Sequence, residues 1–136
     1  RRPASPRVFL ARCVVYPEGR ALTRVPELRA AGLSGAFGQD SIRDPWYPLG
    51  NGNMLRTLDV GLHACHMLGM GWIDRSLELI TDNGAAALDL DEYGIEEGLP
   101  ARCVVLQGQS PYEVLLGQLP VAASIRDGRV LINRQG

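Results

Sequence analysis

Residues 33–53 read LSGAFGQDSIRDPWYPLGNGN, a short apolar run that passes directly into a loop rich in charged and aromatic side chains. The run at 33–38 predicts a short strand, and its small residues Gly35 and Ala36 suit a crowded sheet interior. The prolines and glycines that follow exclude a regular helix or strand. Asp40 therefore stands where a strand ends and an irregular loop begins. Parallel α/β proteins, and TIM barrels especially, carry functional residues at such positions.

Helical and strand patterns alternate on both sides of this stretch. Residues 7–15 are apolar and β-branched enough for a buried strand. Residues 25–31 predict a short helix, because a proline is tolerated in its first turn and a glycine follows its end. Apolar residues then recur at helical spacing from 54 to 68, with Asn53 as the expected N-cap. Strand, helix, strand and helix in this order indicate a parallel α/β unit.

The second half of the chain changes from helical to strand-like patterns. Residues 73–80 and 83–88 predict two further helical segments, the second capped by Thr81 or Asp82. Beyond residue 100 there are three strand-like segments, at 101–106, 121–125 and 129–132. The last two flank an Asp-Gly pair, which is a strong signal for a hairpin. A small appended sheet is therefore expected after the helical region.

The composition restricts the class of protein. With 136 residues, 46% hydrophobic and 21% charged, the chain can bury a core, as one domain or as a piece of a larger one. Its 14 basic and 15 acidic side chains give a net charge of -1, so neither nucleic acid nor an anionic membrane is an expected partner. No apolar run has the length of a membrane span or a signal peptide, and three scattered cysteines argue against a disulfide framework. We expect a cytoplasmic protein.

Asp40 has two interpretations on the residues alone. A carboxylate at the end of a strand can bind a divalent metal and accept a proton from a water molecule that the metal activates. A single aspartate after a single strand more often caps a turn, and spacing alone favours this simpler role. In the same loop, prolines flank Trp46 and Tyr47, whose rings could rest on a planar ligand or could cover the core beneath them. The residues leave both possibilities open.

Other candidate motifs carry less weight. His63 and His66 lie three apart on the expected helix and could share a face toward a metal. They alternate with an apolar stripe and have no third ligand at a suitable spacing, so we interpret them as packed or surface residues. Phosphate-binding glycine loops, the H-x-E with P-C-x-x-C signature of zinc nucleobase deaminases and the G-x-S-x-G elbow are all absent from the sequence.

A longer segment, residues 19–69, carries a family resemblance. It reads GRALTRVPELRAAGLSGAFGQDSIRDPWYPLGNGNMLRTLDVGLHACHMLG and resembles the C-terminal part of the metal-dependent cytosine deaminases of the amidohydrolase superfamily. The shared order is a TRVPEL helix start, the eighth barrel strand, Gly-x-Asp, DPWYPLG and an N-M-L helix that ends in GLH. Residues 81–98 resemble the segment that joins barrel to β-sandwich, and residues 127–132 resemble closing sandwich strands. The resemblance extends from Phe9 to the end of the chain.

The resemblance implies a fold and a site. The fold class would be α/β, with residues 1–98 as the C-terminal part of a TIM-type (β/α)8 metallo-dependent hydrolase barrel and residues 99–136 as strands of a small β-sandwich. Asp40 matches the family's metal ligand and proton-handling catalytic residue. Ser41 stands where the family has a second acidic residue that shapes the substrate pocket. Trp46 matches an aromatic residue that lines the base-binding site.

The resemblance also implies a reaction, the deamination of cytosine or a related cyclic amidine by metal-activated water, with release of ammonia. The divalent metal would be zinc or iron, in an intact enzyme of pyrimidine metabolism. The family's other ligands, a His-x-His pair, further histidines and a glutamate, are not in this sequence. The chain alone is thus expected to hold metal weakly, to be inactive without the N-terminal remainder of the barrel, and to dissolve poorly or self-associate.

Two alternatives remain open at this stage. The chain could be a non-catalytic truncated or accessory amidohydrolase-like module. It could also belong to a sister amidohydrolase that acts on an isocytosine-, creatinine- or triazine-like ring, because the hydroxyl of Ser41 and a carboxylate present different hydrogen bonds to a ring edge. The sequence leaves homo-oligomerisation undecided.

Overall fold

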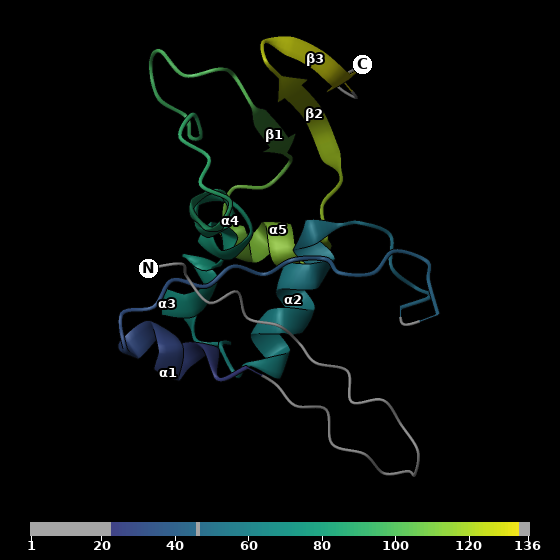
Figure 1. Ribbon diagram of the computed structural model, residues 1–136. Helices are drawn as coiled ribbons and strands as arrows, with labels where there is room; N and C mark the ends of the chain where they lie inside the picture. Colours follow the sequence, from purple (N-terminus) through teal and green to yellow (C-terminus); the bar gives the residue numbers. More distant parts are fainter. Residues whose placement is uncertain (1–22, 46, 134–136) are drawn as a thin grey trace.

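The computed structural model describes residues 23–45 and 47–133 (Figure 1). The strand predicted at 7–15 lies outside these residues. The described elements are, in order, α1 (Val25–Ala30), α2 (Met54–Ala64), α3 (Met70–Ile73), the 3-10 helix η1 (Ser76–Ile80), α4 (Asp82–Ala87), β1 (Cys103–Leu106), α5 (Pro111–Gly117), β2 (Val121–Arg126) and β3 (Arg129–Asn133). No helix in this part of the chain is long and apolar enough to span a membrane.

Helix α2 begins as the sequence predicts and ends earlier. The side chain of Asn53 accepts a hydrogen bond from the backbone N–H of Leu55, which confirms the N-cap. The helix stops at Ala64 because His66 adopts a left-handed conformation, with φ of 56°. The backbone N–H of Met67 then donates to the carbonyl of Leu62, which closes the end in the manner of a Schellman motif. The predicted extension to residue 68 is therefore wrong.

The segment 33–38 forms no strand in the structure, contrary to the prediction. Its polar backbone groups bond instead to the helical region: the N–H of Phe37 donates to the carbonyl of Leu79, and Asn83 Nδ2 donates to the carbonyl of Gly35. A strand exists only where a second strand pairs with it. Among the described residues no strand runs beside this segment, so its apolar, small-residue pattern alone does not produce one.

The helical region after α2 is divided more finely than expected. Residues 70–80 form α3 and η1 rather than one helix over 73–80, and buried Ser76 at the junction donates its hydroxyl to the carbonyl of Ile73. Helix α4 follows at the predicted place, with Thr81 as the N-cap residue. The Thr81 hydroxyl donates to the carbonyl of Leu77 and makes no cap hydrogen bond. The capping position was correctly predicted, but the capping contact was not.

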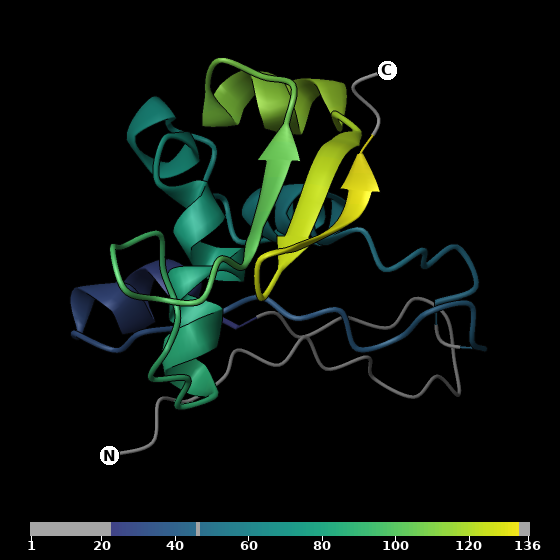
Figure 2. The same cartoon turned by 90° about the horizontal axis from the view of Figure 1, so that it is seen from above.

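The three strands form one antiparallel sheet in the order β1-β2-β3 (Figure 2). The turn between β2 and β3 is made by Asp127 and Gly128, whose φ angles of 51° and 76° are both left-handed. Such a pair gives the turn type whose twist matches that of the two strands, so the predicted hairpin is confirmed. A second sheet, which a sandwich would need, does not occur among the described residues.

Helix α5 is an element that the sequence patterns did not predict. The hydroxyl of Ser110 accepts from the N–H of Glu113, and the Glu113 carboxylate accepts from the N–H of Gln109, which resembles a capping box with its second bond shifted back by one residue. The helix carries Val114 and Leu115 into the main core. That core gathers around α2 and contains Val25, Leu55, Leu58, Leu62, Met67, Leu79, Val114 and Leu115. The sheet segment is thereby tied to the helical segment through α5, while every residue of β3 is exposed.

Candidate active-site loop

The loop between residues 38 and 53 is a folded structure with its own turns. The Asp44 carboxylate accepts a hydrogen bond of 2.8 Å from the N–H of Tyr47, and the N–H of Gly50 donates to the carbonyl of Tyr47. Aspartate turns of this kind compete well with regular structure, which explains why this stretch is neither helix nor strand. The sequence suggested that Asp40 caps a turn; in the structure Asp44 makes the turn-capping contact.

Asp40 does not cap a turn. Its side chain is exposed, and within residues 23–45 and 47–133 it makes no hydrogen bond or ion pair. The neighbouring Ser41 is half-buried. These two residues lie at the start of the loop, but the strand that the sequence predicts before Asp40 is absent, and the Asp40 side chain is exposed to solvent. Trp46, the third predicted site residue, lies outside the described residues.

The backbone next to Asp40 is held by Gln39. The Nε2 of Gln39 donates to the carbonyl of Ser41 at 2.7 Å, and its Oε1 accepts from the Thr57 hydroxyl at 2.6 Å. Thr57 belongs to the first turns of α2, so one amide side chain connects the start of the loop to the helix that follows it. The contact joins residues 18 positions apart, so the local sequence pattern does not predict it.

Gly50 closes the loop on itself. It is buried, and a Cβ atom placed there would come within 2.5 Å of the Ser41 carbonyl oxygen and 2.9 Å of Tyr47 Cδ1. Only glycine allows the end of the loop to approach its beginning this closely. The Ser41 carbonyl is consequently in contact with both the Gln39 amide and the Gly50 backbone.

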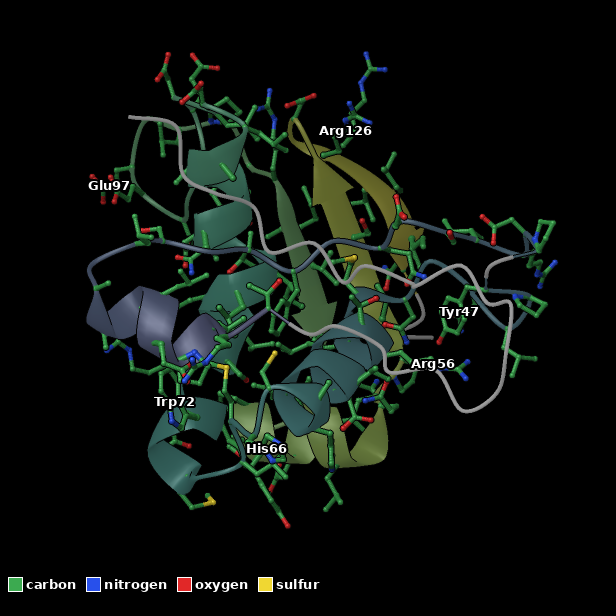
Figure 3. All side chains as sticks on the ribbon, turned by 60° about the horizontal axis from the view of Figure 1, so that its bottom comes forward. Tyr47, Arg56, His66, Trp72, Glu97 and Arg126 are labelled. Carbon is green, nitrogen blue, oxygen red and sulfur yellow. The ribbon has the colours of Figure 1, made fainter. Side chains whose placement is uncertain are left out.

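The Tyr47 and Leu49 part of the loop contacts the Arg56 side chain of α2. The Arg56 guanidinium lies 5.9 Å from the centre of the Tyr47 ring and donates from Nη1 to the carbonyl of Leu49. Figure 3 shows Tyr47 and Arg56 close together on the same side of the molecule. From the sequence, the Tyr47 ring could rest on a planar ligand or cover the core; in the structure it lies against the Arg56 side chain of α2.

The two histidines lie away from the loop. His63 is exposed and its Nδ1 is 3.1 Å from an oxygen of the Asp59 carboxylate, one helical turn earlier. His66 is exposed and terminates α2. The described residues contain no group of three or more histidine, cysteine, aspartate or glutamate side chains that could hold a metal. A catalytic metal needs about three protein ligands, so Asp40 could supply one of them and the others would have to come from elsewhere.

A cavity of about 310 Å³ lies at α1 and α3, lined by Arg29, Gly71, Trp72, Arg75 and Leu79. Figure 3 shows Trp72 on the opposite side of the molecule from Tyr47, so this cavity is not part of the loop. Arg29 stacks over the Trp72 ring at 5.6 Å, and Arg75 is ion-paired with Glu78 at 3.0 Å.

Cys65 shows how the region behind α2 is packed. Burial raises the pKa of its thiol, although its hydrogen bonding to the backbone at Val25 opposes that shift. A thiol with a raised pKa is a weak nucleophile at neutral pH. Cys65 and Cys103 are both half-buried free thiols.

Comparison with known proteins supplies the family context. Residues 3–132 match the model of the Amidohydrolase family. Over 114 residues, the chain is 34% identical to N-isopropylammelide isopropyl amidohydrolase of Pseudomonas sp. (strain ADP), covering 79% of this chain and 27% of that protein. The chain thus spans about a quarter of the length of this curated relative.

Solved structures show the same relationship. The 5-methylcytosine deaminase of Klebsiella pneumoniae, solved with phosphonocytosine, is 51% identical with a TM-score of 0.83, over 90% of this chain and 30% of that one. The same enzyme with 5-fluorocytosine gives 50% and 0.83 over the same shares. N-isopropylammelide isopropylaminohydrolase of Burkholderia multivorans ATCC 17616 is 23% identical with a TM-score of 0.79, over 87% of this chain and 30% of that one, which shows a shared fold.

Proposed function

Because the chain belongs to the amidohydrolase family, we propose that it is the C-terminal part of a larger hydrolase that deaminates cytosine or a closely related ring. The observation that carries this proposal is the 51% identity to a 5-methylcytosine deaminase over 90% of the chain. The Gly-x-Asp and DPWYPLG motifs lie within the family match at 3–132. Residues 1–98 would complete a metallo-dependent hydrolase barrel and residues 99–136 would contribute to a β-sandwich.

In this proposal Asp40 is the chain's contribution to catalysis. Its exposed carboxylate would accept the proton of the attacking water and return it to the departing nitrogen, so that ammonia leaves neutral. It would also be one ligand of a divalent ion, zinc or iron, whose remaining ligands lie in the N-terminal remainder of the barrel. Such an ion lowers the pKa of water and supplies Lewis acidity when bound.

Two further residues would shape the substrate site. Ser41 would present a hydroxyl to the ring edge, and Trp46 would stack against the ring. The half-buried position of Ser41 beside Asp40 supports its role. We expect the partners to be a small nucleobase-like molecule and the upstream barrel, in a cytoplasmic enzyme.

A sister reaction is the second candidate. The 34% identity to an amidohydrolase of N-isopropylammelide favours a triazine-type ring as an alternative substrate. An isocytosine- or creatinine-like ring is a further possibility of the same class. A hydroxyl and a carboxylate offer different hydrogen bonds to a ring edge, so Ser41 is the residue at which these substrates would be distinguished.

The experiment is a substrate panel on the intact enzyme that contains this chain. Ammonia release would be measured with cytosine, 5-methylcytosine, isocytosine and creatinine, and isopropylamine release with N-isopropylammelide, for the wild type and for Asp40→Asn. We expect cytosine or 5-methylcytosine to be preferred, and Asp40→Asn to lower kcat by about a hundredfold or more.

Asp59→Asn is the matched control, because it makes the same chemical change on α2, where Asp59 contacts only His63 among the described residues. Its kcat should stay close to that of the wild type. Equal activity of Asp40→Asn and Asp59→Asn would refute the role of Asp40. Turnover of none of the five compounds would refute the proposed reaction and favour a non-catalytic module.

A further inference from the structure

We propose that Gln39 and Thr57 together are positioning residues for Asp40, through a side-chain clamp that fixes the backbone on both sides of it. The inference rests on the proposed function in one respect: that Asp40 handles protons. The clamp itself is a feature of the described structure, composed of the Gln39 amide, the Thr57 hydroxyl and the Ser41 carbonyl.

The clamp spans Asp40. Gln39 precedes it and Ser41 follows it, and the 2.7 Å bond from Gln39 Nε2 to the Ser41 carbonyl closes a small ring with Asp40 at its tip. The 2.6 Å bond from the Thr57 hydroxyl to Gln39 Oε1 anchors that ring to α2. A carboxylate at the tip of a free loop would have many orientations. Here the Ser41 carbonyl is attached through the Gln39 side chain to α2, a helix whose apolar face is buried in the core.

The orientation of the Gln39 amide follows from its partners. A carbonyl oxygen can only accept, so the amide nitrogen must face Ser41. The amide oxygen then faces Thr57, whose hydroxyl can donate and does so. The Ser41 carbonyl excludes the reverse arrangement, since a flipped amide would place its oxygen against the Ser41 oxygen. Glutamate at position 39 would lose the donor to Ser41 and add a negative charge beside Asp40.

A second contact supports the same carbonyl independently. Gly50 approaches Ser41 so closely that an added Cβ would lie 2.5 Å from its oxygen and 3.1 Å from Ile42 Cα. The Ser41 carbonyl is therefore held by the hydrogen bond from the Gln39 amide and also by the close approach of Gly50. Catalytic groups work within about 0.5 Å of their productive geometry, which explains the value of such support for Asp40.

The test is a set of threonine variants in the intact enzyme. Thr57→Val removes the hydroxyl at nearly constant volume, and Thr57→Ser keeps it. Thr81→Val is the matched control, because the Thr81 hydroxyl also makes a short hydrogen bond, 2.8 Å to Leu77, but lies outside the loop. We expect Thr57→Val to lower kcat about tenfold with KM within about twofold of the wild type, and Thr57→Ser to restore kcat.

Both valine variants should lose similar thermal stability, whereas only Thr57→Val should lose kcat. Gln39→Leu should resemble Thr57→Val, and the double variant should be no slower than the slower single one, because both break one unit. If Thr57→Val and Thr81→Val change kcat equally, or if Thr57→Ser fails to restore it, the positioning role is refuted.

A structural measurement separates this inference from the proposed reaction. Crystal structures of the intact wild type and of Thr57→Val should show the Asp40 carboxylate displaced by more than about 0.5 Å in the variant. If the wild type deaminates nothing while this displacement occurs, the proposed function fails and the clamp stands. An unmoved carboxylate in Thr57→Val would refute the clamp whatever the activity.

Discussion

The contact between Phe37 and α2 provides a stringent test of how the candidate loop is supported. Gly61 lies in α2, and a Cβ atom placed on it would come within 2.6, 2.8 and 3.0 Å of three carbons of the Phe37 ring. Ordinary contacts of a Cβ atom begin near 3.4 Å, so Gly61→Ala overlaps the ring by 0.8 Å at the nearest carbon, 3.4 minus 2.6. Phe37 stands three residues before Asp40, and relief of this overlap must move the Phe37 ring that packs this segment against α2.

The magnitude can be worked out against a control. Replacing a helical glycine by alanine gains about 1 kcal/mol of helix propensity, and overpacking of a well-packed site costs about 1–3 kcal/mol. Gly84→Ala in α4 gains the helix propensity and avoids the overpacking cost, because no atom lies within 4 Å of its added Cβ. The free energy of unfolding of the two variants should therefore differ by about 1–3 kcal/mol, which is the overpacking cost alone.

The assay is thermal unfolding of the intact enzyme, monitored by circular dichroism. We expect Gly84→Ala to unfold at the wild-type temperature or above it, and Gly61→Ala to unfold below Gly84→Ala. Phe37→Leu should partly rescue Gly61→Ala, because the smaller side chain vacates the overlapped space. Equal unfolding temperatures for Gly61→Ala and Gly84→Ala would show that the Phe37 ring does not lie over α2, and the account of how the loop is supported would fail.

Three further predictions concern stability. Asn53→Ala should lower the free energy of unfolding by about 1 kcal/mol, because the N–H of Leu55 loses its hydrogen-bond acceptor, and Asn53→Asp should keep most of the wild-type stability. Thermal unfolding of the two variants measures the difference. Gly128→Ala should cost about 1 kcal/mol, since its left-handed φ of 76° is unfavourable for alanine, and an unchanged unfolding temperature would contradict the hairpin geometry. For Cys65, burial raises the folded-state pKa, so its contribution to stability is complete below the unfolded thiol pKa and disappears as the pH rises through the folded pKa. Cys65→Ala should therefore flatten the alkaline fall in unfolding temperature, and an unchanged fall would contradict this.

Features with a local cause were predictable from the sequence. Asn53 ahead of an apolar stripe gave the start of α2, and Asp127 with Gly128 gave the hairpin, because a cap or a tight turn depends on two or three adjacent residues. The capping box around Ser110 was equally local and would have predicted α5 had the S-P-Y-E pattern been weighed.

Features that depend on distant partners were not predictable. The 33–38 segment has a strand-like composition, yet its backbone bonds to Leu79 and Asn83, far along the chain. The end of α2 is a separate case with a local cause. It depends on a left-handed conformation of His66, which glycine usually adopts and histidine seldom does. The link from Gln39 to Thr57 depends on how the loop folds back over the helix, which no local pattern encodes.

The site was predictable in part and for a different reason. Asp40 and Ser41 were identified by resemblance to a family, and the structure places both at the start of the folded loop, with Asp40 exposed. Their catalytic and binding roles remain predictions. The position of Asp40 after a single predicted strand favoured a turn-capping role for it, and the structure gives that role to Asp44 instead.

The most direct test of the central claim is ammonia release from cytosine, measured together with metal content, for this chain alone and for the chain joined to its upstream barrel. We expect the chain alone to bind little zinc or iron and to release no ammonia. The joined protein should bind the metal and release ammonia from cytosine. Ammonia release by the isolated chain would contradict the claim that Asp40 works with ligands from another part of the barrel.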